Sequence, residues 1–576
     1  MMSTNRAKGR IRPRWWWFVI PIVIAIAWIG GRLLDQAVEH RLQKLGNSIV
    51  GEGYTFNIDR VRARLLEGSI DVIGISLKYD TLKLADLRSG DAQEILTFTA
   101  EILKVRNVSY WELFTEGNVK FHLIEIDRPL IQYYFKPVEE EVAENVVEEG
   151  QVTDLPSLIR VDSLIIRSAH GSTNDISGTR PAFNIGGLDI NAHDLDLRSW
   201  RNGTLTYYIG AALVHAWDLS AELPPIYDLN IADLAVAHPL GTTMAKGVRL
   251  VPRYEKHEYG AHVEQETDLF DIEVDTLLFT GIDVRRFMSE QELHMRRMEI
   301  NSARAKVYRD KTIRDGEFIY KHLPVSGVRK IGISLRVDTV LLGNGRVEYH
   351  EKDKLGPEFG MVSFTDINGI ITGVNNSSDA DTTSHLVAEA SARVYDRTPV
   401  KMLYKASMAS TRDAFTIDAT VGSLPFSVFN RMTDDLLNVK ATAGKIHSLH
   451  LVMNGNETKA TGTLDLVYED LKIDLVPAAE KWHEGKLKNF FGNALVRSRN
   501  QPGDKNYRQG TFTVERRKNR AIFNFIWQAV KAGSVNTMAP GLVRKPISEA
   551  VSKAPEKSGP EPDKKKKEKK RKKRSE

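Results

Sequence analysis

The histidines and acidic residues that could perform chemistry are scattered along this sequence. His257 and His262 flank Glu258, and imidazole and carboxylate groups at this spacing could bind a metal ion. A solvent-exposed polar loop around Gly260 explains the same residues more simply. The sequence contains no cysteine, which removes thiolate metal ligands, cysteine nucleophiles and disulfides together. We therefore predict no metal site.

Sequence motifs of the common enzyme classes are also missing. The chain has no Gly-x-Ser-x-Gly nucleophile elbow and no His-Glu-x-x-His zinc motif, and Gly444-Lys445 continues into Ile446 without the upstream glycine of a phosphate loop. Asp194-Leu-Asp196 would suit a glycosyltransferase, but such enzymes require an alternation of strands and helices that this chain lacks. In a strand, both carboxylates would lie on one polar face. We therefore expect no catalytic residues, no cofactor and no enzymatic activity.

The segment 335–350 shows the alternation of a half-buried strand most clearly. Leu335, Val337 and Leu341 fall on one face, with charged residues on the other. Gly343-Asn344-Gly345 tolerates the positive φ angles of a hairpin turn, so the segment predicts a strand, a turn and a returning strand. We expect Leu335, Val337 and Leu341 to lie in the interior of a sheet.

Variants of this strand phrase recur along the chain. Each has an apolar residue, a polar or charged residue, Ile or Val, and then Asp or Asn, and the copies begin at Ile124, Ile159, Ile272, Met298 and Leu335. Strands separated by Gly, Asn and Asp turns are expected from residue 54 to 135 and from 159 to 475. The sequence therefore predicts a mainly β fold built around one large sheet.

Composition divides the chain into further segments. Residues 35–135 are expected to hold a helix and then strands, residues 136–156 an acidic linker, and residues 157–475 the repetitive sheet. The linker has no convincing apolar face, which favours a solvated segment. Short helices are expected at Val284–Met295 and Phe426–Leu437.

The C-terminal segment 476–552 changes to helical spacing. Helices are predicted for Lys486–Val496 and Asn519–Ala532, with a strand at Gly510–Glu515 between them. The second helix carries a rich apolar stripe, which either packs over the end of the sheet or contacts a membrane or a partner protein. Phe523, Ile526 and Trp527 are our candidates for such a membrane or partner contact.

An apolar run near the start of the chain predicts a membrane anchor over residues 15–34. Trp15–Gly31 contains no charge and, at about 1.5 Å per residue, would form a helix roughly 25 Å long. A cleaved signal peptide is the alternative, because Ala25-Ile-Ala27 resembles a cleavage site, although the apolar run continues beyond it. The basic residues within 1–14 place this segment in the cytoplasm by the positive-inside rule. In a Gram-negative cell the anchor would cross the inner membrane once and the bulk of the chain would be periplasmic.

Charge is distributed unevenly along the chain. Of the net charge of +5, residues 1–14 contribute +5 and residues 563–576 contribute +7, so residues 15–562 carry −7. This mildly acidic body argues against nucleic-acid binding. The Lys- and Arg-rich tail 553–576 is expected to be disordered, and it would either contact anionic lipids or cell-wall polymers or serve as a solubilising tail.

The organisation of the chain resembles the AsmA-like family of Gram-negative envelope proteins, which is related to the β-groove lipid transfer proteins. The resemblance rests on the N-terminal span, the repeated Val-Asp-x-Leu strands and two closing phrases, Ala460–Ile473 and Arg508–Trp527. These phrases are similar to the family's Gly-x-Leu-x-Leu-x-Tyr-x-x-Leu pattern followed by a strand and an amphipathic helix. The run Val307-Tyr-Arg-Asp-Lys311 is similar to versions in Bacteroidetes-type bacteria.

The resemblance implies an elongated, twisted antiparallel sheet that curls into a groove with an apolar lining. It also implies passive phospholipid transport in support of outer-membrane biogenesis, with the inner membrane, phospholipid acyl chains and outer-membrane or envelope proteins as partners. Leu335, Val337 and Leu341 would then line the groove. The family has no catalytic residues to carry over. A second class of function stays open, namely a non-enzymatic envelope scaffold with a closed core that docks partner proteins.

Overall fold

The computed structural model describes the strands and the C-terminal helix of the chain. The described residues are 43–44, 53–64, 68–80, 94–109, 118–135, 158–175, 181–199, 205–223, 225–314, 318–353, 358–376, 384–437, 439–475 and 496–539. The predicted anchor at 15–34, the linker at 136–156, the tail at 553–576 and most of the helix predicted at Lys486–Val496 lie outside these ranges. Within them, every helix is too short or too polar to cross a membrane.

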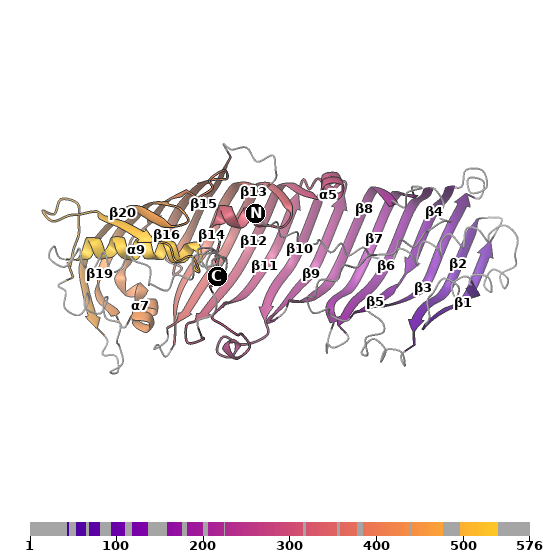
Figure 1. Cartoon of the computed structure of the whole chain (residues 1–576), viewed down its shortest axis with the longest axis horizontal. Coiled ribbons are helices and arrows are strands. Elements are labelled where there is room, and N and C mark those ends of the chain that lie inside the picture. Colours follow the sequence, from indigo (N-terminus) through magenta and orange to yellow (C-terminus); the bar gives the residue numbers. More distant parts are fainter. Residues whose placement is uncertain are drawn as a thin grey trace, which may run out of the picture. The chain divides into compact units, whose positions relative to one another are not determined.

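The described residues form one mixed sheet of 21 strands, which confirms the mainly β fold predicted from the sequence (Figure 1). The first ten strands are β1 (Tyr54–Arg64), β2 (Ser69–Tyr79), β3 (Glu94–Ser109), β4 (Asn118–Asp127), β5 (Leu130–Phe135), β6 (Leu158–Asp175), β7 (Pro181–Ser199), β8 (Leu205–Leu223), β9 (Tyr227–His238) and β10 (Thr242–Pro252). The others are β11 (Asp268–Thr280), β12 (Glu292–Asp310), β13 (Ser334–Lys352), β14 (Phe359–Asn375), β15 (His385–Val394), β16 (Thr398–Ser407), β17 (Phe415–Val421), β18 (Leu424–Pro425), β19 (Val439–Gly455), β20 (Lys459–Leu475) and β21 (Gly510–Glu515).

The sequence predicts an antiparallel sheet, whereas the observed sheet is mixed, because three strand pairs run parallel. They are β4–β6, β5–β6 and β12–β13. After β12 the chain passes through the short helix α6 (Pro324–Arg329) before β13 begins. This crossover returns the chain to the edge of the sheet where β12 begins, so β13 runs in the same direction as β12.

The predicted hairpin at 335–350 is also wrong, because the whole segment lies within the single strand β13. Asn344 has a positive φ angle of 52°, as a turn residue would, but β13 stays paired with β12 and β14 on both sides of it. The ladder to β14 changes register between Leu342 and Gly345. The Gly-Asn-Gly segment therefore forms a β-bulge inside a long strand rather than a turn at its end.

The described helices are short, apart from the last one. They are η3 (Tyr259–Ala261), α5 (Val284–Glu290), α6, η4 (Phe426–Phe429), α7 (Asn430–Leu437) and α9 (Ile522–Met538). The helix predicted at Val284–Met295 ends early, because Gln291 adopts a left-handed conformation and β12 begins directly after it. The helix predicted at Phe426–Leu437 and the strand predicted at Gly510–Glu515 are confirmed.

The chain divides into two compact units. The first comprises Met1–Pro224 and Asp228–Val248, and the second comprises Pro225–Tyr227 and Arg249–Glu576. The main core of the first unit lies among β1 to β4 and β6, where Ile70, Val105 and Phe121 are completely buried.

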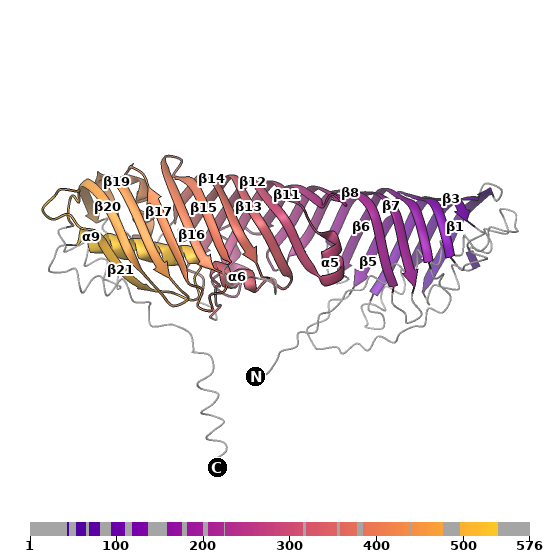
Figure 2. The ribbon, with the colours of Figure 1, turned by 90° about the horizontal axis from the view of Figure 1, so that it is seen from above.

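The main core of the second unit lies under α9, which packs against β20 and β21 (Figure 2). Phe525 and Ala529 on α9 are buried against Leu464 and Val514 of these strands. The approach is close because glycines face each other: a Cβ atom on Gly510 would lie 2.2 Å from the carbonyl oxygen of Gly533. The apolar stripe of this helix therefore packs over the sheet, one of the two outcomes that the sequence leaves open.

Candidate functional site

The ladders of the first unit are interrupted at matching positions in neighbouring strands. Asp162 is skipped in the pairing of β6 with both β4 and β7, although pairing continues on either side. Asp194 and Gly210 are skipped in the same way between β7 and β8. Asp194 is left-handed, with a φ angle of 54°. We call such a position a ladder break; a left-handed residue there bends the strand and increases its twist.

Each ladder break shifts the alternation of the strand by one residue. In β6 the apolar residues Ile159 and Val161 precede Asp162, and Leu164 and Ile166 follow it at a spacing of three rather than two. All four pack into the same hydrophobic cluster. Because β6, β7 and β8 each carry a ladder break at the matching position, the pairing register between these strands is kept. One face of β6 to β8 therefore stays apolar along its length.

On β6 this apolar face packs against the core of the first unit, and it continues across β7 and β8 with less burial. Directly opposed residues share a face, and the rows Val161–Leu195–Ile209, Leu164–Ala192–Ala212 and Ile166–Ile190–Val214 define it. Its larger side chains are only half-buried. Among the described residues of β7 to β10, the fully buried hydrophobic side chains are three alanines, Ala192, Ala216 and Ala245. Half-buried apolar side chains gathered on one face are typical of a binding surface.

The opposite face of the same strands is polar. Arg160 donates two hydrogen bonds to the carboxylate of Asp196, at 2.8 and 3.2 Å. Ser163 and His193 lie within hydrogen-bonding distance, at 2.9 Å between Oγ and Nδ1. Leu213 is on this face and is 60% exposed. The two faces therefore differ in chemistry, and the apolar face is the candidate site.

The predicted lining residues lie in the second unit. Val337 is buried in a cluster with Met295 and Val340, and Leu335 packs against that cluster. Asp338 is a ladder break, since it is skipped in the pairing of β13 with β12 and β14. The uninterrupted alternation expected from the sequence therefore fails after Val337. Leu341 lies directly opposite Glu299 and Ile370, on the other face of β13 from Val340, so it does not share a face with Val337 as predicted.

The residues predicted for a membrane or partner contact lie on α9. Phe523 is 75% exposed and Trp527 is 40% exposed, and their spacing of four places them on the same side of the helix. Ile526 packs against the core on which the buried face of α9 rests. The structure therefore leaves two of the three side chains accessible.

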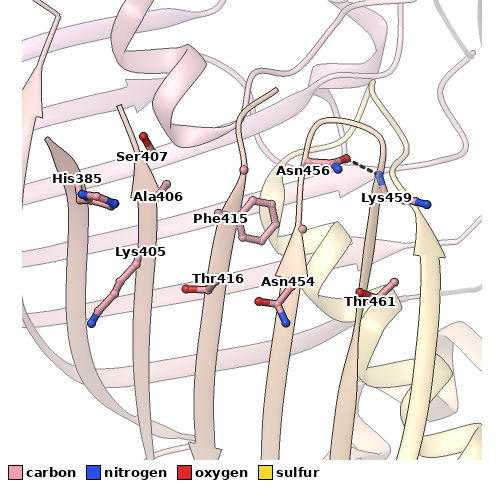
Figure 3. Close-up of a pocket in the computed structure, with 12 residues that line it drawn as sticks. His385, Lys405, Ala406, Ser407, Phe415, Thr416, Asn454, Asn456, Lys459 and Thr461 are labelled. Atoms are coloured by element: carbon pink, nitrogen blue, oxygen red, sulfur yellow. Dashed lines mark hydrogen bonds between the residues drawn. The ribbon is translucent and has the colours of Figure 1, made fainter. Parts of the chain in front are cut away.

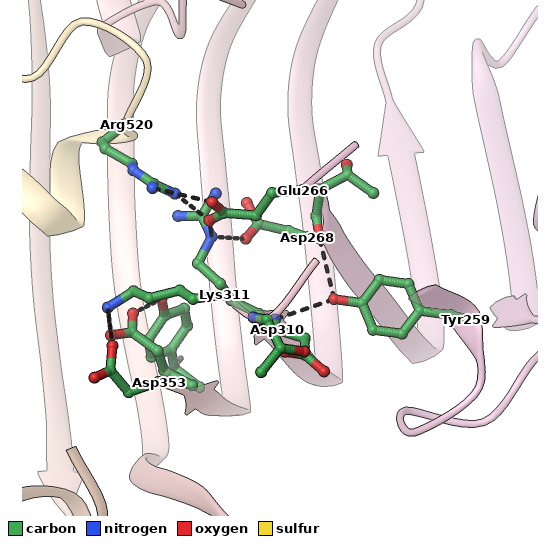
Figure 4. Close-up of polar contacts among 12 residues, drawn as sticks. Tyr259, Glu266, Asp268, Asp310, Lys311, Asp353 and Arg520 are labelled. Atoms are coloured by element: carbon green, nitrogen blue, oxygen red, sulfur yellow. Dashed lines mark hydrogen bonds and ion pairs between the residues drawn. The ribbon is translucent and has the colours of Figure 1, made fainter. Parts of the chain in front are cut away.

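A dense polar cluster connects the loop after β10, strand β12 and the segment before α9 (Figure 4). Glu266 is the centre, because its carboxylate accepts from Arg520 at 2.7 Å and forms an ion pair with Arg309 at 3.1 Å. Arg309 also pairs with Asp268 at 3.0 Å. The Tyr259 hydroxyl accepts from the backbone N–H of Asp310 and donates to the carbonyl of Thr267. Burial raises the pKa of Tyr259 to about 12.

A second part of this cluster surrounds Glu351. Lys311 donates to one oxygen of its carboxylate and the Tyr349 hydroxyl donates to the other, at 2.6 Å for Tyr349. Burial alone would raise the pKa of Glu351, but Lys311 and Tyr349 hold it below its ordinary value. Burial raises the pKa of Tyr349. These carboxylates are engaged by neighbouring cations and hydroxyls, which fits a cross-link between segments better than proton transfer.

The histidines near this cluster are involved in aromatic contacts. His262 stacks on Tyr254 with ring centroids 3.5 Å apart, and His257 meets Phe359 edge-on at 5.4 Å. Within the described ranges, no three His, Asp or Glu residues are grouped in a way that could hold a metal ion.

A shallow pocket of about 540 Å³ lies at the ends of β15, β16, β17, β19 and β20 (Figure 3). Its polar lining includes Lys405, Thr416, Asn454 and Thr461, which are consecutive partners across the ladders. No carboxylate is among its lining residues, which include His385 and Lys459. It therefore lacks a pair of carboxylates.

Comparison with known proteins adds no identification: no protein-family model matches the chain, and no curated protein matches it.

Proposed function

We propose that this chain is an AsmA-like envelope protein that carries phospholipid acyl chains in an apolar groove formed by its sheet. It would be anchored in the inner membrane by residues 15–34, with the bulk of the chain in the periplasm, and would support outer-membrane biogenesis without catalysis. The observation that carries the proposal is the continuous apolar face of β6 to β8, whose large side chains are only half-buried in the described structure.

The physical basis of the proposal is the cost of exposing acyl chains to water. Each methylene group that leaves water gains about 0.8 kcal/mol when fully buried. The ladder breaks at Asp162 and Asp194 would curl the sheet around the apolar face and raise the number of side chains that one acyl chain contacts. Such a surface lowers the cost of transit equally in both directions, so the direction of transport would come from the membranes or from partner proteins.

Identification of bound lipids and of their position tests the proposal. The full chain is solubilised in detergent and purified, and its lipids are identified by mass spectrometry; we expect co-purified phospholipid. A photo-crosslinking amino acid is then placed at Ile190, on the apolar face, and in a control variant at Asn191, on the opposite face of the same strand. We expect a lipid adduct from position 190 only. Lipid-free protein, or equal adducts from both positions, would refute the groove.

A second candidate function is an envelope scaffold that docks partner proteins through α9. The exposed aromatic side chains of Phe523 and Trp527 favour it, because aromatic residues are enriched in interfaces. This function predicts that Phe523→Ser with Trp527→Ser abolishes capture of an envelope partner without changing lipid content. The groove predicts that lipid content depends on Ile190 instead.

A further inference from the structure

The outer edge of β1 is closed by other groups of the first unit. β1 pairs with β2 on one side. On its other side, the side-chain amide of Gln43 accepts from the backbone N–H of Ile58 at 3.0 Å and donates to the carbonyl of Phe56. These two bonds are the ones that a neighbouring strand would make. The exposed charges of Arg60 and Arg62 follow on the same strand, and charged side chains disfavour edge-to-edge pairing.

The outer edge of β21, in the second unit, differs in its hydrogen bonding. The backbone N–H of Arg516 donates to the carbonyl of Thr458 at 2.7 Å, which shows which residues of this ladder face β20. Bonded pairs alternate along an antiparallel ladder, so the backbone N–H and C=O groups of Thr511, Thr513 and Glu515 point away from β20. Among the described residues, no hydrogen-bond partner of these groups is found. The edge of β21 therefore presents backbone donors and acceptors to a further strand.

β21 also lacks the features that usually protect an edge strand. Its register with β20 is unbroken, and its sequence Gly-Thr-Phe-Thr-Val-Glu contains no proline, lysine or arginine. Phe512 and Val514 are buried in the core under α9, which fixes the strand in place. Thr511 and Thr513 are exposed on the opposite face. An ordered edge whose single charge lies at its last residue is a template for a further strand.

We propose that β21 pairs with the β21 strand of a second copy of this chain, antiparallel and centred on Thr513. In this register Thr513 lies opposite its own counterpart, and opposed threonines stabilise a strand pair. Glu515 lies opposite Thr511 of the other copy, so no two carboxylates are opposed. Both strands present Phe512 and Val514 to the same face, so the α9 helices of the two copies lie on the same side of the joined sheet. This pairing is independent of lipid binding by the apolar face of β6 to β8.

The contrast between the two edges favours a closed dimer of identical chains. Head-to-tail growth would require β21 of one copy to pair with β1 of the next, where Gln43 already occupies backbone groups of Phe56 and Ile58. A β21 edge that pairs with itself uses the same surface in both copies, so the assembly closes at two chains. Addition of a strand from another protein is the alternative, which the experiment separates.

Site-specific crosslinking tests this geometry in the full chain, purified in detergent. The chain contains no cysteine, so a single introduced cysteine reports one contact. At the centre of the antiparallel pair the two Cα atoms would lie about 5.5 Å apart, a separation that a disulfide spans. We therefore expect Thr513→Cys to form a disulfide-linked dimer under mild oxidation. In the matched control Thr511→Cys, the two cysteines would lie about 13 Å apart along the strands and should stay unlinked.

A charge placed at the same positions tests the register by a second route. The dissociation constant of the dimer is measured by analytical ultracentrifugation. In Thr513→Lys the two lysines would face each other, and we expect the dissociation constant to rise at least tenfold. In Thr511→Lys each lysine would face Glu515 of the other copy, and we expect a dimer at least as tight as that of the unchanged chain. Both side chains are exposed, so the melting temperature should stay the same.

The other possible results overturn the proposal. A chain that is monomeric at all concentrations, or that forms assemblies larger than two, does not form a closed dimer through β21. Equal crosslinking at positions 511 and 513 would show random collision, and a dimer that neither lysine affects would be joined elsewhere. A monomer that crosslinks from position 513 to another envelope protein would assign the edge to that partner. None of these outcomes changes the lipid content on which the proposed function depends.

Discussion

The apolar face of β6 to β8 can be made polar without removing buried side chains. The substitutions Ile166→Thr, Ile190→Thr and Val214→Thr change three directly opposed, half-buried residues in one row. Threonine is β-branched and favours strands, so the sheet should be retained. The matched control changes Ile165→Thr and Leu213→Thr, in the neighbouring row on the opposite face.

The expected loss of lipid affinity follows from the apolar groups removed. The three substitutions remove about five methylene-sized groups, a loss of about 4 kcal/mol if each were fully covered by an acyl chain. An acyl chain lying on the sheet covers them from one side, so we take half, about 2 kcal/mol, which corresponds to about thirtyfold in Kd. The control removes a similar number of groups but should change the Kd by less than twofold.

The assay is a titration of each variant with a phospholipid that carries a fluorescent acyl chain. Circular dichroism and the melting temperature verify that the variants are folded. If the triple variant binds as tightly as the unchanged chain, or the control loses as much affinity, acyl chains do not bind on this face and the reasoning is refuted.

Three further substitutions probe the fold, each by the midpoint of denaturant unfolding. Asp194→Val places a β-branched residue at a φ angle of 54° and should cost about 1–2 kcal/mol, whereas Asp194→Gly should be tolerated; equal stability of both would show that the ladder break is unstrained. Gly533→Ala puts a Cβ atom 2.6 Å from that of Leu464 and should cost about 1–3 kcal/mol, whereas Gly327→Ala meets no atom within 4 Å and should cost nothing. Glu266→Gln leaves Arg309 and Arg520 without their shared carboxylate and should cost about 3 kcal/mol; Glu101→Gln, which breaks an exposed pair with Arg128, should cost less than about 1 kcal/mol, and a similar loss in both would contradict the role of burial.

Strand positions are predicted well from the sequence because their signals are local. Alternation and flanking turn residues are enough to locate Gly510–Glu515, which forms β21 within the same bounds. The apolar stripe of α9 is equally visible, although the structure was needed to show that Phe525 and Ala529 face the sheet while Phe523 faces outward.

The wrong predictions concern features that depend on neighbouring strands. A positive φ angle at Asn344 suits a hairpin and a bulge equally, and the pairing partners of β13 decide between them. Parallel pairing of β12 with β13 depends on where the connecting segment leads. The ladder breaks have a sequence signal: in Val-Asp-x-Leu the apolar residues are three apart, as at Val161 and Leu164, which departs from simple alternation.

The candidate site was only partly accessible to sequence reasoning. Leu335 and Val337 were expected in the sheet interior, and the structure places both in or against a hydrophobic cluster. The half-buried row through Ile166, Ile190 and Val214 was missed, because a sequence does not show which apolar strands receive a cover.

The uneven distribution of buried cores has a consequence for how each unit folds and unfolds. Most strands pair with their neighbours in sequence, as β6, β7 and β8 do, so stability passes mainly between adjacent strands, as in repeat proteins. Strands with no dry core of their own can persist only while their neighbours stay in place. The core around Phe121 in the first unit and the core under α9 in the second would then act as caps. Damage to a cap should fray the adjoining strands one after another, whereas damage to a middle strand should leave the cap folded.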